Sequence, residues 1–277
     1  PPRSTLFPYT TLFRSAHAYK KIWRKKSNES PLLYFTRSQA EKLNSKIGNE
    51  KIIVDFAMRY GNPSIKLKLN ILKNAGCENI IILPLYPQYA AATTATVCDE
   101  VYRSLMSMRW QPSLQVIPHY ESEPIYIDAL IRSIKEKLGL IKWKPDLIIS
   151  SYHGIPKKYF DKGDPYHCYC HKTTRLMKEN FNEIDIQTTF QSRFGPQEWL
   201  TPYTDKTLES LPRKGVKNLL VICPGFASDC VETLEEIDIQ GRESFMENGG
   251  INFDLIPCLN DNSDHINLFE KLVKKYI

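Results

Sequence analysis

Asp146-Leu-Ile-Ile-Ser-Ser-Tyr-His-Gly-Ile-Pro156 is the stretch that decides the fold of this chain of 277 residues. Its first half is an apolar run that predicts a buried β-strand. Gly154 and Pro156 then stop the strand and turn the chain. His153 is therefore expected just past the carboxyl end of a strand, the edge at which ligands bind in open parallel α/β sheets.

Strand-like and helix-like segments alternate from residue 51 onward, which predicts parallel sheets covered by helices, an α/β fold. The expected strands are Ile52–Ala57, Asn79–Leu85, Leu114–Pro118, Asp146–Ser151, Asp185–Gln191, Asn218–Cys223 and Phe253–Pro257. The expected helices include Thr94–Met106, Ile125–Leu138, Thr173–Phe181, Val231–Met246 and Asp264–Tyr276.

Three pairs of segments echo each other in the same order along the chain: 75–87 with 214–226, 115–119 with 254–258, and the strand ending at Gly61 with the strand ending at Gly195. This repetition predicts two similar lobes, with a cleft between them that collects strand-end loops from both. The strand of His153 opens the second lobe. Its counterpart should precede Ile52, and no such strand is visible.

The first fifteen residues, Pro1 to Ser15, show no helical or strand period and resemble a translated sequencing adapter. We expect them to be a non-native leader that replaces the true amino terminus. Residues 16–124 are expected to form the first lobe without its opening strand, joined by a C-terminal helix over 262–277. Residues 125–261 are expected to form the second lobe.

Composition narrows the class of protein. The net charge is +6, but no basic stretch is interleaved with aromatic residues, so we expect no nucleic-acid binding. No apolar run approaches the roughly 20 residues that span a bilayer. Seven cysteines, an odd number, fit a reducing cytoplasm better than a disulfide framework. A basic surface still favours an anionic membrane or an anionic substrate.

Asp229, Glu232, Glu236 and Glu243 are spaced to share one face of an α-helix. A charged face is usually solvated, and acids in the first turn favour the helix dipole. Glu243 lies too far along to gain from the dipole, so the ridge suits a divalent cation. A lone strand-end histidine is more often structural, but His153 with Glu232 in the same lobe can hold a metal or move protons.

Two further clusters follow strand ends. Tyr86 and Tyr89 precede Thr93 and Thr94 at a helix start, which suits a flat aromatic ligand bearing carboxylates, or else a helix cap with core tyrosines. The run from His167 to His171 contains Cys168 and Cys170, but its spacing is too tight for a C-x-x-C zinc knuckle. Dinucleotide, Walker A and nucleophile-elbow motifs are absent.

In combination these motifs resemble ferrochelatase, the family that inserts ferrous iron into a porphyrin, and most closely its bacterial form. The segments that carry the resemblance lie across residues 16–277; they are Leu83–Tyr89, Ser151–Pro156, Gly163–Tyr166, Phe190–Pro196 with Trp199, and Pro224–Glu236. The resemblance implies two Rossmann-like lobes, each a parallel sheet flanked by helices, with the porphyrin in the cleft.

The resemblance carries His153 and Glu232 over as the catalytic and metal-site pair, with Glu236 and Asp229 on an acidic path beside them; the ridge extends this path to Glu243. It does not decide which member of the pair touches iron first. The residues expected in contact with the porphyrin are Arg59, Tyr86, Tyr89, Thr93, Thr94, Ser192 and Trp199.

The resemblance further implies that protoporphyrin IX and ferrous iron are converted to protohaem, the last step of haem biosynthesis. No resident cofactor is expected, although an iron–sulfur cluster on internal cysteines stays open, and a peripheral membrane contact is plausible for the family. The alternatives are a chelatase for coproporphyrin or cobalt, and a non-catalytic two-lobed tetrapyrrole- or solute-binding protein. A chain without its first core strand can also be inactive.

Overall fold

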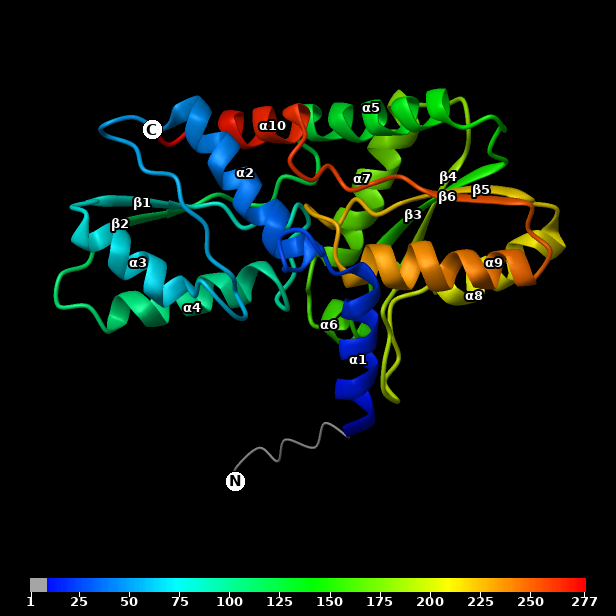
Figure 1. The fold of residues 1–277 in the computed structure, drawn as a ribbon, viewed down its shortest axis with the longest axis horizontal. Helices are drawn as coiled ribbons and strands as arrows, with labels where there is room; N and C mark the ends of the chain where they lie inside the picture. Colours follow the sequence, from blue (N-terminus) through cyan, green and yellow to red (C-terminus); the bar gives the residue numbers. More distant parts are fainter. Residues whose placement is uncertain (1–8) are drawn as a thin grey trace.

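The structure is a computed structural model that describes residues 9–277. The backbone forms two lobes, at the left and right of Figure 1, with two helices running along the top. Both lobes contain a parallel sheet flanked by helices, as the alternating sequence pattern predicts. The two-lobed α/β architecture expected from the internal repeat is confirmed.

The second lobe contains a sheet of four parallel strands. Their order across the sheet is β4 (Ile186–Gln191), β3 (Leu147–His153), β5 (Asn218–Ile222) and β6 (Asn252–Leu255). β3 lies inside the sheet, and its residues from Leu147 to Tyr152 are all buried. Because helices cover both faces of a parallel sheet, an interior strand can be apolar throughout, which explains the run that precedes His153.

Alternate side chains of these strands face different helices. Ile148 and Leu220 share a core with α5 (Pro124–Leu140), α7 (Tyr166–Asn180) and α10 (Ser263–Val273). Leu147 and Leu219 point to the other face, where they pack with α8 (Thr204–Ser210), a π-helix (Glu232–Gly241) and α9 (Arg242–Glu247). Two short pieces complete the lobe: α6 (Lys157–Asp161) and a 3₁₀ turn (Leu211–Lys214).

The first lobe is built on two parallel strands, β1 (Asn79–Ile82) and β2 (Ser113–Val116). On one face Ile80 packs with α3 (Ile65–Asn74) and α4 (Thr94–Met106). On the other face Ile81 packs against the core that contains α2 (Pro31–Ile47).

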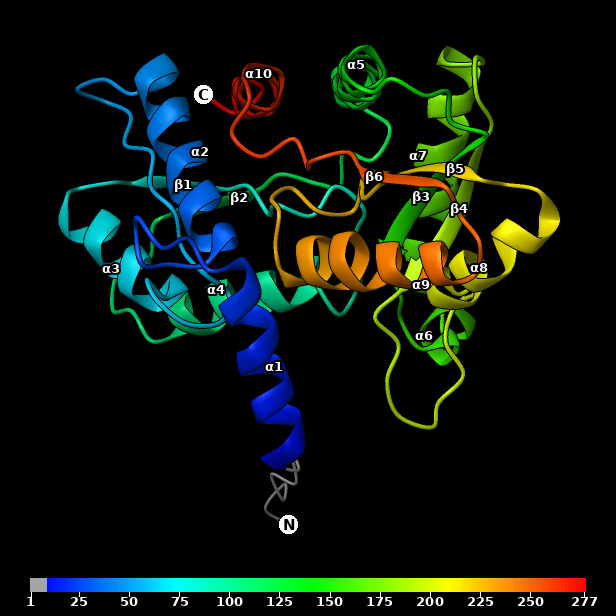
Figure 2. The same ribbon diagram turned by 45° about the vertical axis from the view of Figure 1, so that its right-hand side comes forward.

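One apolar core joins the lobes. Helix α10 packs against both α2 and α5, and Figure 2 shows α10 and α5 side by side and end-on above the junction. The core therefore draws side chains from both halves of the chain, among them Leu43, Ile134 and Phe269. The predicted division at residues 124 and 262 stays a prediction, because α10 serves both lobes.

Helix α1 (Tyr9–Ile22) projects from the body of the molecule, and its carboxyl end lies beside the π-helix (Figure 1). The Lys21 ammonium lies 3.1 Å from the Glu235 carboxylate. The expected leader lies partly outside the described residues, namely Pro1–Pro8. Tyr9–Ser15 of this segment belongs to α1, although the sequence shows no helical period there. Its non-native origin stays a prediction.

Two predicted elements differ in the structure. Ile52–Ala57 was expected as a strand, but among residues 9–277 it pairs with no strand, because strand pairing requires a partner that the sequence pattern alone does not supply. The helix expected over Val231–Met246 is present, but most of it is a π-helix with wider turns. The spacing of apolar residues predicts which face of the helix is buried. It does not predict whether the backbone hydrogen bonds follow the α-helical or the π-helical pattern.

No helix in the described part of the chain combines the length and the apolar character that crossing a bilayer requires.

Leu220 in β5 is completely buried, whereas Leu140 at the end of α5 is 79% exposed. We expect Leu220→Ala to lower the free energy of unfolding by about 2–5 kcal/mol, because it leaves a cavity in the shared core. Leu140→Ala removes the same atoms from the surface, and we expect it to change the free energy of unfolding by less than about 0.5 kcal/mol. Urea unfolding of both variants measures the difference; equal midpoints would contradict the core assignment.

Candidate active site

His153 ends β3, directly opposite Gln191 of β4 in the sheet register. Its Nδ1 lies 2.7 Å from the carbonyl oxygen of Gly154. A carbonyl oxygen can only accept a hydrogen bond, so Nδ1 carries the proton in the neutral ring. The lone pair of Nε2 is then available to accept a proton or to bind a metal.

The position of Gly154 leaves no room for a side chain. Its N–H donates to the carbonyl of Gln191 at 2.7 Å. A Cβ at this position would lie 2.9 Å from that carbonyl oxygen and 3.2 Å from the ring of Trp199. The glycine therefore lets the chain turn tightly after His153, and the buried ring of Trp199 supports the turn from one side.

The side-chain amide of Gln191 connects this strand end to the π-helix. Its Nε2 donates to the backbone carbonyl of Glu232 at 2.7 Å and lies 3.3 Å from the carboxylate of Glu236. Its Oε1 accepts from the hydroxyl of Ser151 at 2.7 Å. Gln191 is buried, and its contacts fix the first turn of the π-helix relative to His153.

Ser192 holds the carboxylate of Glu236 with two donors. Its backbone N–H lies 2.7 Å from Glu236 Oε1, and its hydroxyl donates to Oε2. Ser192 has a φ of 63°, in the left-handed region that costs a non-glycine residue roughly 1–2 kcal/mol. Burial raises the pKa of Glu236, while the Ser192 donors and the nearby His153 oppose this rise. Glu236 and His153 are thus electrostatic neighbours.

Glu232 faces the first lobe. Burial raises the pKa of Tyr86, and the neighbouring Tyr60 and Glu232 raise it further, whereas Arg59 lowers it. Arg59 is held by a hydrogen bond of 2.8 Å from its Nε to the carbonyl of Thr96, with its guanidinium 4.5 Å from the ring centre of Tyr60. Arg59 of the first lobe and Glu232 of the second lobe therefore both lie near Tyr86.

Two predicted members of the acidic path lie elsewhere. The carboxylate of Asp229 is buried and accepts from Thr233, the backbone of Cys258 and Asn260, at 3.0, 3.3 and 2.7 Å. These bonds tie the start of the π-helix to the loop after β6. Glu243 is exposed on α9. A single acidic face calculated for an α-helix does not carry through the wider turns of the π-helix; a path through Asp229 and Glu243 stays a prediction.

The remaining predicted porphyrin contacts follow β1. Tyr89 is partly buried, and burial together with Asp164 raises its pKa. Thr93 is the N-cap of α4, and its hydroxyl donates to the carbonyl of Ala90. The hydroxyl of Thr94 is buried and meets no hydrogen-bond partner within the described residues. Their contact with porphyrin stays a prediction.

Sequence reasoning overlooked two glutamines. Gln191 lies within the Phe190–Pro196 segment, but its role was not predicted. The signal for it is that it ends a strand beside the strand that ends at His153. Gln88 is buried in the run after β1, and its Nε2 donates to Thr173 of α7 at 3.0 Å. It thereby links the loop of the first lobe to the second lobe.

The histidine- and cysteine-containing run lies at the start of α7. The rings of His167 and His171 lie 4.4 Å apart between centroids, Cys170 is buried and Cys168 is exposed. Within residues 9–277, no three histidine, cysteine or acidic side chains are placed to hold one metal ion.

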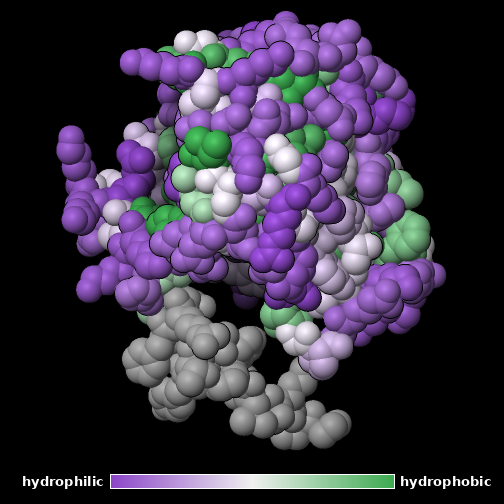
Figure 3. Space-filling model, turned by 90° about the vertical axis from the view of Figure 1, so that its right-hand side faces the viewer, coloured by the Kyte–Doolittle hydropathy of each residue, from purple (hydrophilic) through white to green (hydrophobic). Residues whose placement is uncertain are grey.

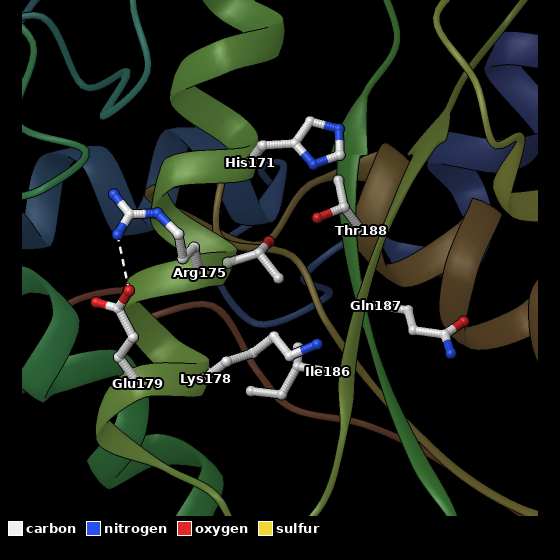
Figure 4. A pocket seen from close by; sticks show the side chains of 8 residues that line it. His171, Arg175, Lys178, Glu179, Ile186, Gln187 and Thr188 are labelled. Atoms are coloured by element: carbon white, nitrogen blue, oxygen red, sulfur yellow. Dashed lines mark hydrogen bonds and ion pairs between the residues drawn. The ribbon is translucent and has the colours of Figure 1, made fainter.

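A hollow of about 640 Å³ lies away from this site, between α7 and the amino-terminal half of β4 (Figure 4). Its charged residues are already paired: Arg175 lies 2.7 Å from Glu179, and Lys178 lies 2.7 Å from Asp185. The surface of this side of the molecule is largely hydrophilic (Figure 3). None of the predicted catalytic or porphyrin-binding residues lines this hollow, so the strand ends around His153 are the better candidate.

Comparison with solved structures supports the fold. The chain is similar to SirB from Bacillus subtilis with Fe3+, with a TM-score of 0.67, 12% identity, and coverage of 91% of this chain and 90% of that one. It is also similar to CbiX, described as the terminal enzyme for biosynthesis of siroheme in denitrifying bacteria, with a TM-score of 0.61, 11% identity, and coverage of 89% and 93%. At this identity the likeness concerns the fold alone.

Comparison of sequences identifies the family. The ferrochelatase family profile matches residues 4–277. Ferrochelatase from Allorhizobium ampelinum is 53% identical over 261 residues, which cover 93% of this chain and 76% of the relative. Ferrochelatase from Brucella ovis is 50% identical over 265 residues, which cover 95% and 75%. The chain therefore belongs to the ferrochelatase family, the enzymes that insert ferrous iron into protoporphyrin in haem synthesis.

Proposed function

We propose that His153 and Glu232 form the reaction centre of this ferrochelatase, with Glu236 beside them and protoporphyrin IX in the cleft. The observation that carries the proposal is the state of His153: its Nδ1 is committed to Gly154, which leaves Nε2 basic at the strand end. Glu236 is its electrostatic neighbour, and Gln191 connects both to the first turn that carries Glu232.

Insertion of Fe²⁺ into a free-base porphyrin releases two pyrrole protons, so the site needs two acceptors. Neutral His153 takes one proton on Nε2 and becomes an imidazolium. A carboxylate takes the second, and the buried Glu236, whose pKa is raised, is suited to accept it. Glu232, which faces the first lobe, is the proposed ligand that receives iron, because Nε2 of His153 can bind the metal only before it takes a proton.

In this proposal, residues of both lobes bind the porphyrin and hold it in a bent shape. Iron enters a porphyrin when the ring bends and its nitrogen lone pairs tilt out of the plane. Binding energy from groups remote from the reacting nitrogens can hold a bent ring. Arg59 and Tyr86 offer a cation and an aromatic face on the first lobe, with Trp199 packed beside the turn on the second. Tyr89, Thr93, Thr94 and Ser192 complete the proposed lining.

We expect the protein to metallate protoporphyrin IX with ferrous iron under anaerobic conditions. His153→Ala should reduce the rate by about 10²–10⁴-fold, because a positioned base is lost, while porphyrin still binds. His171→Ala, an exposed histidine of the same lobe, should leave the rate unchanged. Absorbance follows the rate and porphyrin fluorescence follows binding. An active His153→Ala variant would overturn the role of this residue.

The variant Ser192→Ala tests whether the hydrogen bond from the Ser192 hydroxyl sets the pKa of Glu236. The Ser192 donors lower the pKa of Glu236 against the effect of burial. Without the hydroxyl, the pKa of Glu236 rises further and the carboxyl stays protonated to a higher pH. The acid limb of kcat/KM should then move to higher pH. Ser133→Ala, which removes a hydroxyl bonded within α5, serves as the control. A pH profile identical to that of the parent enzyme would contradict the role of Glu236 as acceptor.

We also infer a peripheral contact between an anionic membrane and the segment that leads from α1 to α2. Tyr19 and Trp23 are 38% and 40% exposed, and Lys25 and Lys26 are exposed beside them. Aromatic rings with flanking lysines suit the boundary between headgroups and acyl chains. Tyr19 also lies near Glu232, so the contact would be close to the cleft.

The protein should co-sediment with vesicles rich in phosphatidylserine, and the bound fraction should fall as salt rises from about 0.05 to 0.5 M. Replacing both Lys25 and Lys26 with Glu should weaken binding by more than about tenfold, at roughly 1 kcal/mol per lysine. Replacing Lys51 and Lys66 with Glu makes the same charge change elsewhere on the first lobe. Equal losses in both pairs would indicate attraction by net charge without a defined contact.

A further inference from the structure

Two histidines of the second lobe have no role in the reaction proposed above. His167 and His171 lie four positions apart near the start of α7, and residues at this spacing share one face of a helix. Their ring centroids are 4.4 Å apart. In the sequence the two cysteines of this run stand out, but in the structure its two imidazoles lie together.

The cysteines of the run are less suited to bind a shared ligand. Cys170 is buried beside Tyr166 in the core, and burial raises the pKa of its thiol well above the ordinary value, so the thiol stays protonated. Cys168 is exposed, but it directly follows His167, and adjacent residues of a helix do not face each other. The imidazole pair is therefore the better candidate for binding a ligand.

The ring nitrogens of this pair are less committed than those of other histidines. His119, His153 and His265 each have a ring nitrogen within 2.7 Å of a carboxylate or carbonyl oxygen. Within residues 9–277, neither His167 nor His171 has such a partner, and their neighbours are aromatic rings. The nitrogen lone pairs of both rings are therefore available to a ligand.

Aromatic side chains hold the two imidazoles in place. His167 is stacked on Phe190, a buried residue of β4, with ring centroids 5.7 Å apart and 20° between the ring planes. Phe160 lies 5.0 Å from His167, and Phe190 lies 6.0 Å from His171. Because packed rings lose less freedom when a ligand binds, the pair is partly preorganised.

The two imidazoles are neutral. Burial lowers the pKa of His167, and burial together with His167 lowers the pKa of His171. Both rings are therefore unprotonated on one nitrogen near pH 7, which is the form in which histidine binds metal ions.

The space beside His171 admits water and small ligands. His171 is exposed and lines the hollow between α7 and β4, beside Thr188 (Figure 4). Arg175, one turn further along α7, points away from His171 and toward Glu179. A cation bound by the imidazoles would therefore have room for water ligands and would not meet the guanidinium of Arg175.

The sheet separates this pair from the reaction centre. Neighbouring residues of a strand point to opposite faces of a sheet. Phe190 packs with α7, whereas Gln191 bonds to the π-helix on the other face. His153 lies directly opposite Gln191 in the adjacent strand and shares its face. An ion on the α7 face would therefore be distinct from an ion held by His153.

We propose that His167 and His171 form a binding site for a divalent transition-metal ion, separate from the reaction centre. Imidazole suits Zn²⁺, Ni²⁺ and Cu²⁺, and two histidines four apart on a helix can bind one such ion together. With metal–nitrogen distances of about 2.0–2.1 Å and a right angle at the ion, the ring centroids lie about 4.5 Å apart. The observed 4.4 Å fits this arrangement.

The site is expected to exchange its ion. It supplies two protein ligands, consistent with the finding that no three metal-binding side chains of residues 9–277 converge, and water supplies the rest. Structural zinc sites, by comparison, have four protein ligands. The proposal does not rest on the roles proposed for His153 and Glu232.

Equilibrium dialysis with Ni²⁺, which does not oxidise thiols, tests the site in the absence of porphyrin and iron. The host is the His153→Ala variant, which removes a ligand of the reaction centre. We expect this variant to bind one Ni²⁺, and the further change His171→Ala to weaken binding by at least about tenfold, because the second imidazole binds intramolecularly. Hydrogen–deuterium exchange should slow in residues 166–175 when Ni²⁺ binds.

Two matched variants isolate the spacing and the ligand type. His171→Ala with Arg175→His keeps the number of histidines but places them about two turns apart, so it should bind as weakly as His171→Ala. Cys168→Ser removes the exposed thiol and should leave binding unchanged. The proposal is overturned if the His153→Ala host binds no Ni²⁺, if the respaced variant binds as tightly as the host, or if Cys168→Ser abolishes binding.

Discussion

The side-chain amide of Gln191 is the contact on which the rest of the site depends. It lies opposite His153 in the register of β3 and β4, accepts from Ser151 within the sheet, and donates to the first turn of the π-helix. A buried amide that loses a partner costs about 1–3 kcal/mol, so the arrangement that satisfies all its bonds is strongly preferred. Three elements far apart in the sequence are thereby held at one geometry, and His153 and Glu232 inherit that geometry.

The carboxylates of the site then differ because their surroundings differ. Glu236 is buried and held by two donors of Ser192, a residue in a strained backbone conformation. Glu232, one turn earlier, accepts from Gln191 through its backbone carbonyl, and its carboxylate lies near Cys230 and near Tyr86 of the first lobe. The strained backbone of Ser192 costs free energy, which the two hydrogen bonds to Glu236 have to offset. Strain retained in this way is typical of functional sites, so it supports a role for Glu236. Separate environments for neighbouring acids are the usual basis for separate roles in proton transfer.

The sequence predicted the parts that depend on local pattern. The apolar run before His153 is a buried strand with the histidine at its end, and α4 has the predicted bounds, Thr94–Met106. Features that depend on contacts between segments far apart in the sequence could not be predicted from the local pattern. Ile52–Ala57 has a strand pattern but no strand beside it, and Gln191 is important only because register places it opposite His153. Helix α3 lies between two expected strands, where the alternation predicts a helix, although Ile65-Lys-Leu-Lys-Leu69 alternates as a strand does; the cap provided by Ser64 and the packing against α4 favour the helix.

The two lobes are built on sheets of unequal size. The proposed proton acceptors belong to the lobe with a four-stranded sheet, in which β3 is bonded on both sides, whereas Arg59 and Tyr86, the proposed porphyrin contacts, belong to the lobe with two paired strands. Arg59 lies two residues beyond the segment 52–57, and Tyr86 lies four residues beyond the end of β1. The proposed porphyrin contacts of the first lobe and the proposed proton acceptors of the second lobe therefore depend on separate sheets, although one apolar core joins the two lobes.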